Sequence, residues 1–171
     1  MLITFLIFSY TLIFIILAAL AYRDLKEYIL PDILNAALAL TFIFFHTLSH
    51  WQLVKPMEAL EGMLTGGGLL LIIRTLANKY YRQDSLGLGD VKLMAAAGIG
   101  LGFPNIFMAL SIGAFAGVLH GFIMAVIEKK KTSHKIDLSR VNVPAGVGLA
   151  FGIAIVMVVQ FGFVWLIPLQ K

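Results

Sequence analysis

The sequence contains no cysteine, which excludes disulfide bonds and thiolate-bound zinc or iron–sulfur centres. Charge is also scarce: Asp, Glu, Lys and Arg make up 13% of the 171 residues, about half of what soluble domains carry. Hydrophobic residues account for 60% of the chain. So little charge among so many apolar residues is typical of an integral membrane protein.

The apolar residues form six segments separated by short polar stretches. We expect these segments at 2–22, 31–49, 57–77, 90–102, 105–127 and 144–168. As a helix, the fourth would reach only about 20 Å, less than the hydrocarbon core of about 30 Å. The sequence therefore predicts an all-α, polytopic membrane protein with six transmembrane helices and a short fourth helix. We expect a single membrane-embedded domain over residues 1–171.

Basic residues are distributed unevenly between the connections. Lys and Arg are frequent after the first, third and fifth segments, whereas the opposite side carries only Lys55 and Lys171. By the positive-inside rule the richer side is cytoplasmic, so both termini are predicted to lie outside a cytoplasmic (cell) membrane. The basic loop 128–142 is expected to be either a solvated run of charges or a contact to membrane lipid through its lysines, and no nucleic-acid partner is expected.

A carboxylate follows two glycines in the stretch Gly87-Leu88-Gly89-Asp90, where the fourth segment begins. An acidic side chain at the edge of hydrocarbon is costly, which makes Asp90 a functional candidate. The two glycines allow another backbone to approach closely and do not block access to the carboxylate. Their spacing matches neither of the common phosphate-binding glycine motifs. Helix capping by Asp90 is the structural alternative.

Asp24 ends the first segment, and the predicted topology returns it to the same cytoplasmic side as Asp90. Taken alone, Asp24 also fits a loop carboxylate paired with Arg23 or Lys26, and Asp32 is expected to cap the second helix. Two carboxylates held close together cannot both ionise easily. One can then activate water while the other donates a proton to a peptide carbonyl, as in an aspartic protease.

Three stretches together resemble a known family, the type IV prepilin peptidases. The stretches are Asp24 with Leu30-Pro31-Asp32, then Gly87-Leu88-Gly89-Asp90-Val91-Lys92-Leu93, and Val143-Pro144-Ala145-Gly146. These enzymes are six-helix membrane aspartic proteases of the GxGD type, and they include archaeal preflagellin peptidase relatives. The resemblance implies an endopeptidase that cleaves prepilin or pilin-like precursors, in which a basic leader precedes a hydrophobic helix, at the cytoplasmic face.

The resemblance also assigns roles to individual residues. It implies that Asp24 and Asp90 are the catalytic pair, and Gly87, Gly89, Lys92 and Asp32 are candidates for supporting roles. Larger bacterial members carry a cytoplasmic extension with paired cysteines and also methylate the new N-terminus. This sequence has no cysteine and starts with an apolar segment. We therefore expect leader cleavage without methyltransferase activity.

No cofactor and no metal is expected. His46 and His50 are spaced by four residues but lack a third ligand, and His120, inside the fifth segment, is expected to be structural. A protease of the presenilin type is ranked lower because its first aspartate motif differs and it has more helices. From another class, a proton- or cation-coupled transport protein would also use paired aspartates, but deeper in the membrane.

Overall fold

The computed structural model describes residues 2–82, 84, 86–131 and 144–162. Over these residues the chain is all-helical, without strands. The helices are α1 (Leu2–Glu27), α2 (Asp32–Leu48), α3 (Pro56–Tyr81), α4 (Leu88–Leu101), α5 (Asn105–Lys131) and α6 (Ala145–Phe161). The expected all-α fold is confirmed, and each expected segment corresponds to one helix. Residues 163–168 of the last expected segment lie outside the described residues.

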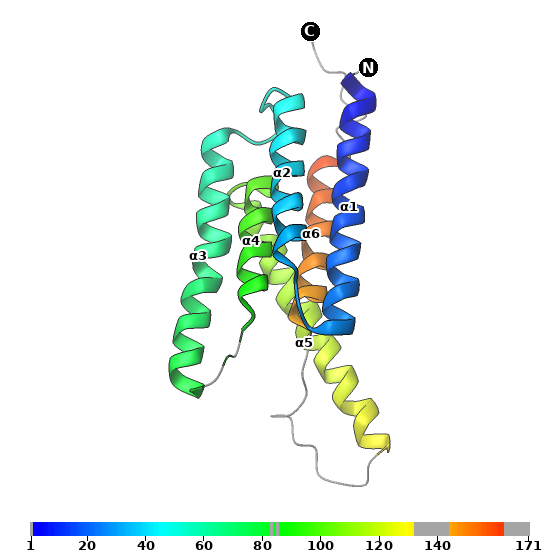
Figure 1. Ribbon diagram of the computed structural model, residues 1–171, viewed down its shortest axis with the longest axis vertical. Coiled ribbons are helices and arrows are strands. Elements are labelled where there is room, and N and C mark those ends of the chain that lie inside the picture. The colour runs from blue at the N-terminus through cyan, green and yellow to red at the C-terminus, as the bar shows by residue number, and fades with distance from the viewer. Residues whose placement is uncertain (1, 83, 85, 132–143, 163–171) are drawn as a thin grey trace.

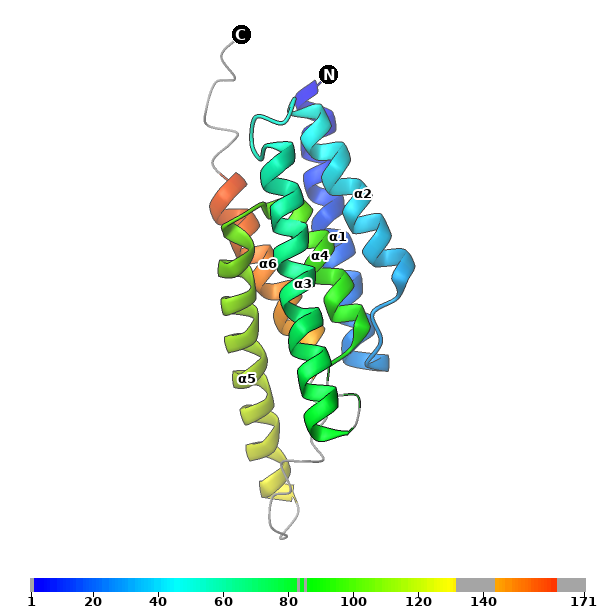
Figure 2. The same cartoon turned by 90° about the vertical axis from the view of Figure 1, so that its left-hand side faces the viewer.

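Successive helices run in opposite directions (Figure 1). Consequently α1, α3 and α5 finish at the end of the bundle where α2, α4 and α6 begin. This end carries Asp24 and Asp90 and is called the site end below. At the site end α3 and α5 extend past the start of α4, as Figures 1 and 2 both show.

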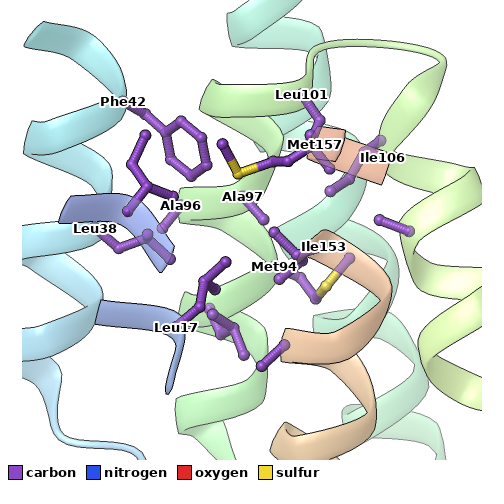
Figure 3. Packing of buried hydrophobic residues seen from close by; sticks show 14 of the residues in the cluster. Leu17, Leu38, Phe42, Met94, Ala96, Ala97, Leu101, Ile106, Ile153 and Met157 are labelled. Atoms are coloured by element: carbon purple, nitrogen blue, oxygen red, sulfur yellow. The ribbon is translucent and has the colours of Figure 1, made fainter. Parts of the chain in front are cut away.

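Helix α4 is the centre of the bundle. It packs against α2, α3, α5 and α6, and Leu93, Met94, Ala97 and Leu101 are among its buried side chains. Figure 3 shows residues of α4 packed between those of α1, α2, α5 and α6. A helix that is apolar all round is expected to be buried. With 14 residues, α4 confirms the expected short fourth helix.

Glycines set the separation of the helices at two crossings. Gly62 of α3 faces Gly98 of α4, and a β-carbon on either glycine would collide with the backbone of the other helix. In the same way, Gly148 and Gly152 of α6 lie against the backbone of α5 near Gly113. Because lipid provides no hydrophobic drive between helices, such close van der Waals contact is what holds them together.

Among the described residues, three helices are long and apolar enough to cross a membrane: α1, α3 and the part of α5 from Asn105 to Ile123. Two others, α2 and α6, are apolar but have only 17 residues each, or about 26 Å of helix. These helices indicate a membrane protein. The expectation of six spans with both termini outside stays a prediction.

Candidate active site

Asp24 lies in the last turn of α1, and its side chain is buried. The alternative of a loop carboxylate paired with a neighbouring base is wrong, because α1 continues to Glu27. Arg23 donates to Glu27 at 2.8 Å instead, an i,i+4 ion pair that supports this last helical turn. The helix therefore directs Asp24 into the bundle and keeps Arg23 outside.

The carboxylate of Asp24 is held by the start of α6. The backbone N–H of Val147 donates to Asp24 Oδ2 at 3.1 Å. Val147 lies in the first turn of α6, where N–H groups have no partner within the helix and the helix dipole favours a negative charge. Gly146 leaves the necessary room, since a β-carbon there would lie 2.9 Å from Asp24 Oδ2.

Asp90 lies in the first turn of α4 and is also buried. Its Oδ2 faces Gly87, where a β-carbon would come within 3.0 Å of it, and the Gly87 backbone N–H stabilises the carboxylate. The other oxygen, Oδ1, is buried and has no hydrogen-bond partner among the described residues. A buried polar atom without a partner is costly, so a substrate group or a water molecule that could bond to it is favoured there.

Leu30 joins the surroundings of the two aspartates. This buried residue precedes α2, and a β-carbon on Gly89 would lie 2.7 Å from Leu30 Cβ. A β-carbon on Gly146 would lie 2.8 Å from Leu30 Cδ1. The starts of α4 and α6 therefore pack on one side chain, which brings together the segment that carries Asp90 and the segment that holds Asp24.

The candidates Lys92 and Asp32 pair with each other, away from the two buried carboxyls. Lys92 Nζ donates to Asp32 Oδ2 at 2.6 Å, with both side chains substantially exposed. The expectation that Asp32 caps α2 is wrong, because the N-terminus of α2 has no side-chain capping bond; the lysine is the stronger partner for the carboxylate. Lys92 and Asp32 line a cavity of about 330 Å³ that neither Asp24 nor Asp90 lines.

Asn35 is a contributor that sequence reasoning missed. Its Nδ2 donates to the Gly89 carbonyl at 3.3 Å and so ties α2 to the start of α4. Gly146 entered the sequence argument only through the family resemblance, and Val147 not at all. A single sequence contains no pattern that marks either contact. Asn35 is an amide within an apolar run, and the Val147 N–H lies more than a hundred residues from its acceptor, Asp24.

An apolar groove of about 540 Å³ lies near the starts of α4 and α6, and neither Asp24 nor Asp90 lines it. Its walls come from α3, α5 and α6, with Leu70, Gly117 and Leu149 among the lining residues. Leu86 and Ala145 also line it. These two residues immediately precede Gly87 and Gly146, so the groove reaches the backbone segments that hold both carboxyls.

The contacts of His46 fit a structural role. His46 is fully buried, donates from Nε2 to the Gly100 carbonyl at 2.9 Å and stacks on Trp51. His120 is half-buried on α5. Within the described ranges, no three His, Cys, Asp or Glu side chains gather in a way that could hold a metal ion.

The fold and this site define a class: helical membrane proteins that bury a pair of aspartates at one end of the bundle. Within that class, the sequence model of the type IV leader peptidase family matches residues 11–122. The chain belongs to this family, which confirms the resemblance drawn from its motifs. The matched range includes Asp24, Asp90 and Lys92 but ends before Gly146.

Curated relatives carry matching names. The prepilin leader peptidase/N-methyltransferase of Escherichia coli K12 is 26% identical over 119 residues, which is 70% of this chain and 52% of that protein. The type 4 prepilin-like proteins leader peptide-processing enzyme of Escherichia coli O78:H11 is 30% identical over 123 residues, 68% of this chain and 42% of that protein. The chain thus spans about half the length of the curated relatives it matches. No solved structure matches the chain significantly.

Proposed function

We propose that this protein is a membrane aspartic endopeptidase that removes the leader of prepilin or pilin-like precursors at the cytoplasmic face. The observation that carries the proposal is that Asp24 and Asp90 are both buried at the site end, where Gly146 and Gly89 pack on Leu30, although 66 residues separate the two aspartates in sequence. The relatives named as prepilin leader peptidases support the substrate class. Whether methyl transfer is absent, as expected from the sequence, stays a prediction.

The different surroundings of the two carboxyls suggest their roles. Asp24 accepts the Val147 N–H at a helix N-terminus, which favours a carboxylate and hence a general base. Asp90 has a buried oxygen without a partner among the described residues, which suits a protonated acid that donates to the substrate. In the proposed mechanism the two buried carboxyls act as a pair that holds one proton, because neighbouring like charges disfavour double ionisation.

The proposed reaction balances with this single shared proton. As a water oxygen bonds to the scissile carbonyl carbon, Asp24 takes a proton from the water and Asp90 gives its proton to the carbonyl oxygen. The C–N bond of the resulting tetrahedral intermediate then breaks. The leaving nitrogen takes the proton held by Asp24, and one hydroxyl of the intermediate returns a proton to Asp90.

The apolar groove offers a place for the hydrophobic helix of the precursor. Because the groove reaches Leu86 and Ala145, a helix lying in it would end beside the two carboxyls. The leader on the other side of the scissile bond would then extend beyond the site end, toward the cytoplasm in the proposed topology. Cleavage would fall at the boundary between the leader and the helix.

The test is cleavage of a pilin-like precursor by the purified protein in detergent. Asp24→Asn and Asp90→Asn should each lower kcat by roughly a thousandfold or more, because each removes one half of the proton exchange. Glu61→Gln is the matched control, since Glu61 is an exposed acid on α3. If both asparagine variants cleave normally, the catalytic assignment is wrong. If the wild type does not cleave and instead moves protons or cations in liposomes, the transport alternative replaces it.

A further inference from the structure

In the part of the segment before α4 that the structure describes, and at the start of α4 itself, two positions close to Asp90 are glycines. α3 ends at Tyr81 and α4 begins at Leu88. Gly87, the residue at the N-cap of α4, supplies no side-chain capping bond, and Gly89 follows two residues later. Glycine gives a backbone more conformational freedom than any other residue. A catalytic group at position 90 therefore needs a constraint from elsewhere in the fold.

Arg74 of α3 supplies such a constraint. Its Nε donates to the Leu86 carbonyl at 2.8 Å, and its Nη2 donates to Asp84 Oδ1 at 3.1 Å. Asn78, one turn further along α3, donates to the same Asp84 oxygen at 2.9 Å. Leu86 lies immediately before Gly87, so the arginine bonds to the backbone at the last position before the glycines.

The two hydrogen bonds of Arg74 differ in how strongly they constrain the backbone before α4. Asp84 is exposed, with 83% of its side chain accessible, and an exposed ion pair contributes little to stability. The bond to the Leu86 carbonyl is shorter and is made by an arginine side chain that is only 25% exposed. A guanidinium is a rigid plane, so binding at Asp84 also fixes the direction of its Nε–H toward Leu86.

We infer that Arg74 is a positioning residue for Asp90: it fixes the backbone at Leu86 and thereby the place of the Asp90 carboxyl against Asp24. This inference rests on the proposed catalytic role of Asp90. A role in positioning predicts a loss in the chemical step, since a displacement of about 1 Å can cost about a hundredfold in rate. A role as a surface charge predicts no such loss.

Four variants in the precursor assay separate these roles. Arg74→Gln should lower kcat by about tenfold or more and leave KM within about twofold. Arg74→Lys keeps the charge but lacks the planar fork, so it should recover only part of kcat. Asp84→Asn keeps the acceptor oxygen and should stay near wild type. Lys79→Gln is the matched control, because Lys79 is exposed at the same end of α3 and no bond joins it to the described part of the connection.

The outcomes are distinguishable. If Arg74→Gln retains the kcat of the wild type, or if Lys79→Gln loses as much, the inference is overturned while the catalytic pair stands. If Arg74→Gln does not fold in a thermal unfolding assay, Arg74→Lys decides: a folded lysine variant with full kcat overturns the inference, and a folded one with reduced kcat and unchanged KM supports it. If the wild type itself does not cleave, the proposed function fails and the inference fails with it.

Discussion

Gly146 is a position where a small substitution should disturb the catalytic site without disturbing the packing of the helices. A β-carbon at this position would meet Asp24 Oδ2 at 2.9 Å and Leu30 Cδ1 at 2.8 Å, both at the far end of side chains. Side-chain ends can move at little cost, so the fold tolerates the added methyl group. The carboxylate of Asp24 cannot move without changing its bond to the Val147 N–H. Gly152 differs, because there a β-carbon would collide with the backbone of α5.

We predict that Gly146→Ala lowers kcat by about tenfold or more while the unfolding temperature stays near that of the wild type. Cleavage rates and thermal unfolding of the same preparations measure the two effects. Gly68→Ala is the control, since no atom lies within 4 Å of a β-carbon at Gly68, and it should change neither quantity. Gly152→Ala should instead lose stability, by about 1–3 kcal/mol for overpacking. Full activity in Gly146→Ala would show that the bond between Val147 and Asp24 is dispensable.

Helices α3, α5 and α6 leave the apolar groove between them, and one glycine in its wall is open toward it. Nothing lies within 4 Å of a β-carbon at Gly117, which lines the groove. The glycine at position 68 on α3 is equally open but does not line the groove. The two positions therefore accept the same substitution with different consequences for a bound helix.

We predict that Gly117→Leu raises KM for a full precursor by about fivefold, which corresponds to about 1 kcal/mol of lost helix packing. Gly68→Leu should leave KM unchanged. A short peptide that spans the scissile bond but lacks the hydrophobic helix should be cleaved equally by both variants, because it does not use the groove. Equal KM values for the full precursor would contradict the docking of its helix in this groove.

The helical fold of the described residues followed from composition and from the lengths of the apolar segments, because lipid allows few alternatives to a helical bundle. Asp24 and Asp90 could also be paired from sequence, since alternating helices return them to one end. The last turn of α1 was missed because Arg23 and Glu27 resemble a polar loop until their i,i+4 pairing is known. The contacts of Gly146, Asn35 and Arg74 are long-range or go to backbone atoms, and a single sequence contains no pattern for them.

The proposed orientation in the membrane also rests on the opposite directions of successive helices. Among the described residues, Lys26 and Arg82 are exposed at the site end, and Gln52 is exposed at the opposite end, between α2 and α3. Crossing between these ends requires α2, whose 17 residues give about 26 Å of helix, close to the hydrocarbon thickness. A labelling experiment on both ends therefore tests the orientation together with the crossing of α2 and α3.

Because the sequence contains no cysteine, each introduced cysteine is the only reactive thiol, and the labelling can be assigned to one position. We predict that Gln52→Cys reacts with a membrane-impermeant maleimide added to intact cells, whereas Lys26→Cys and Arg82→Cys react only after the membrane is opened. In inverted vesicles the pattern should reverse. If all three positions label from the same side, α2 and α3 do not cross the membrane as proposed. If Lys26→Cys and Arg82→Cys label from outside, the two aspartates face away from the cytoplasm, and cleavage at the cytoplasmic face is wrong.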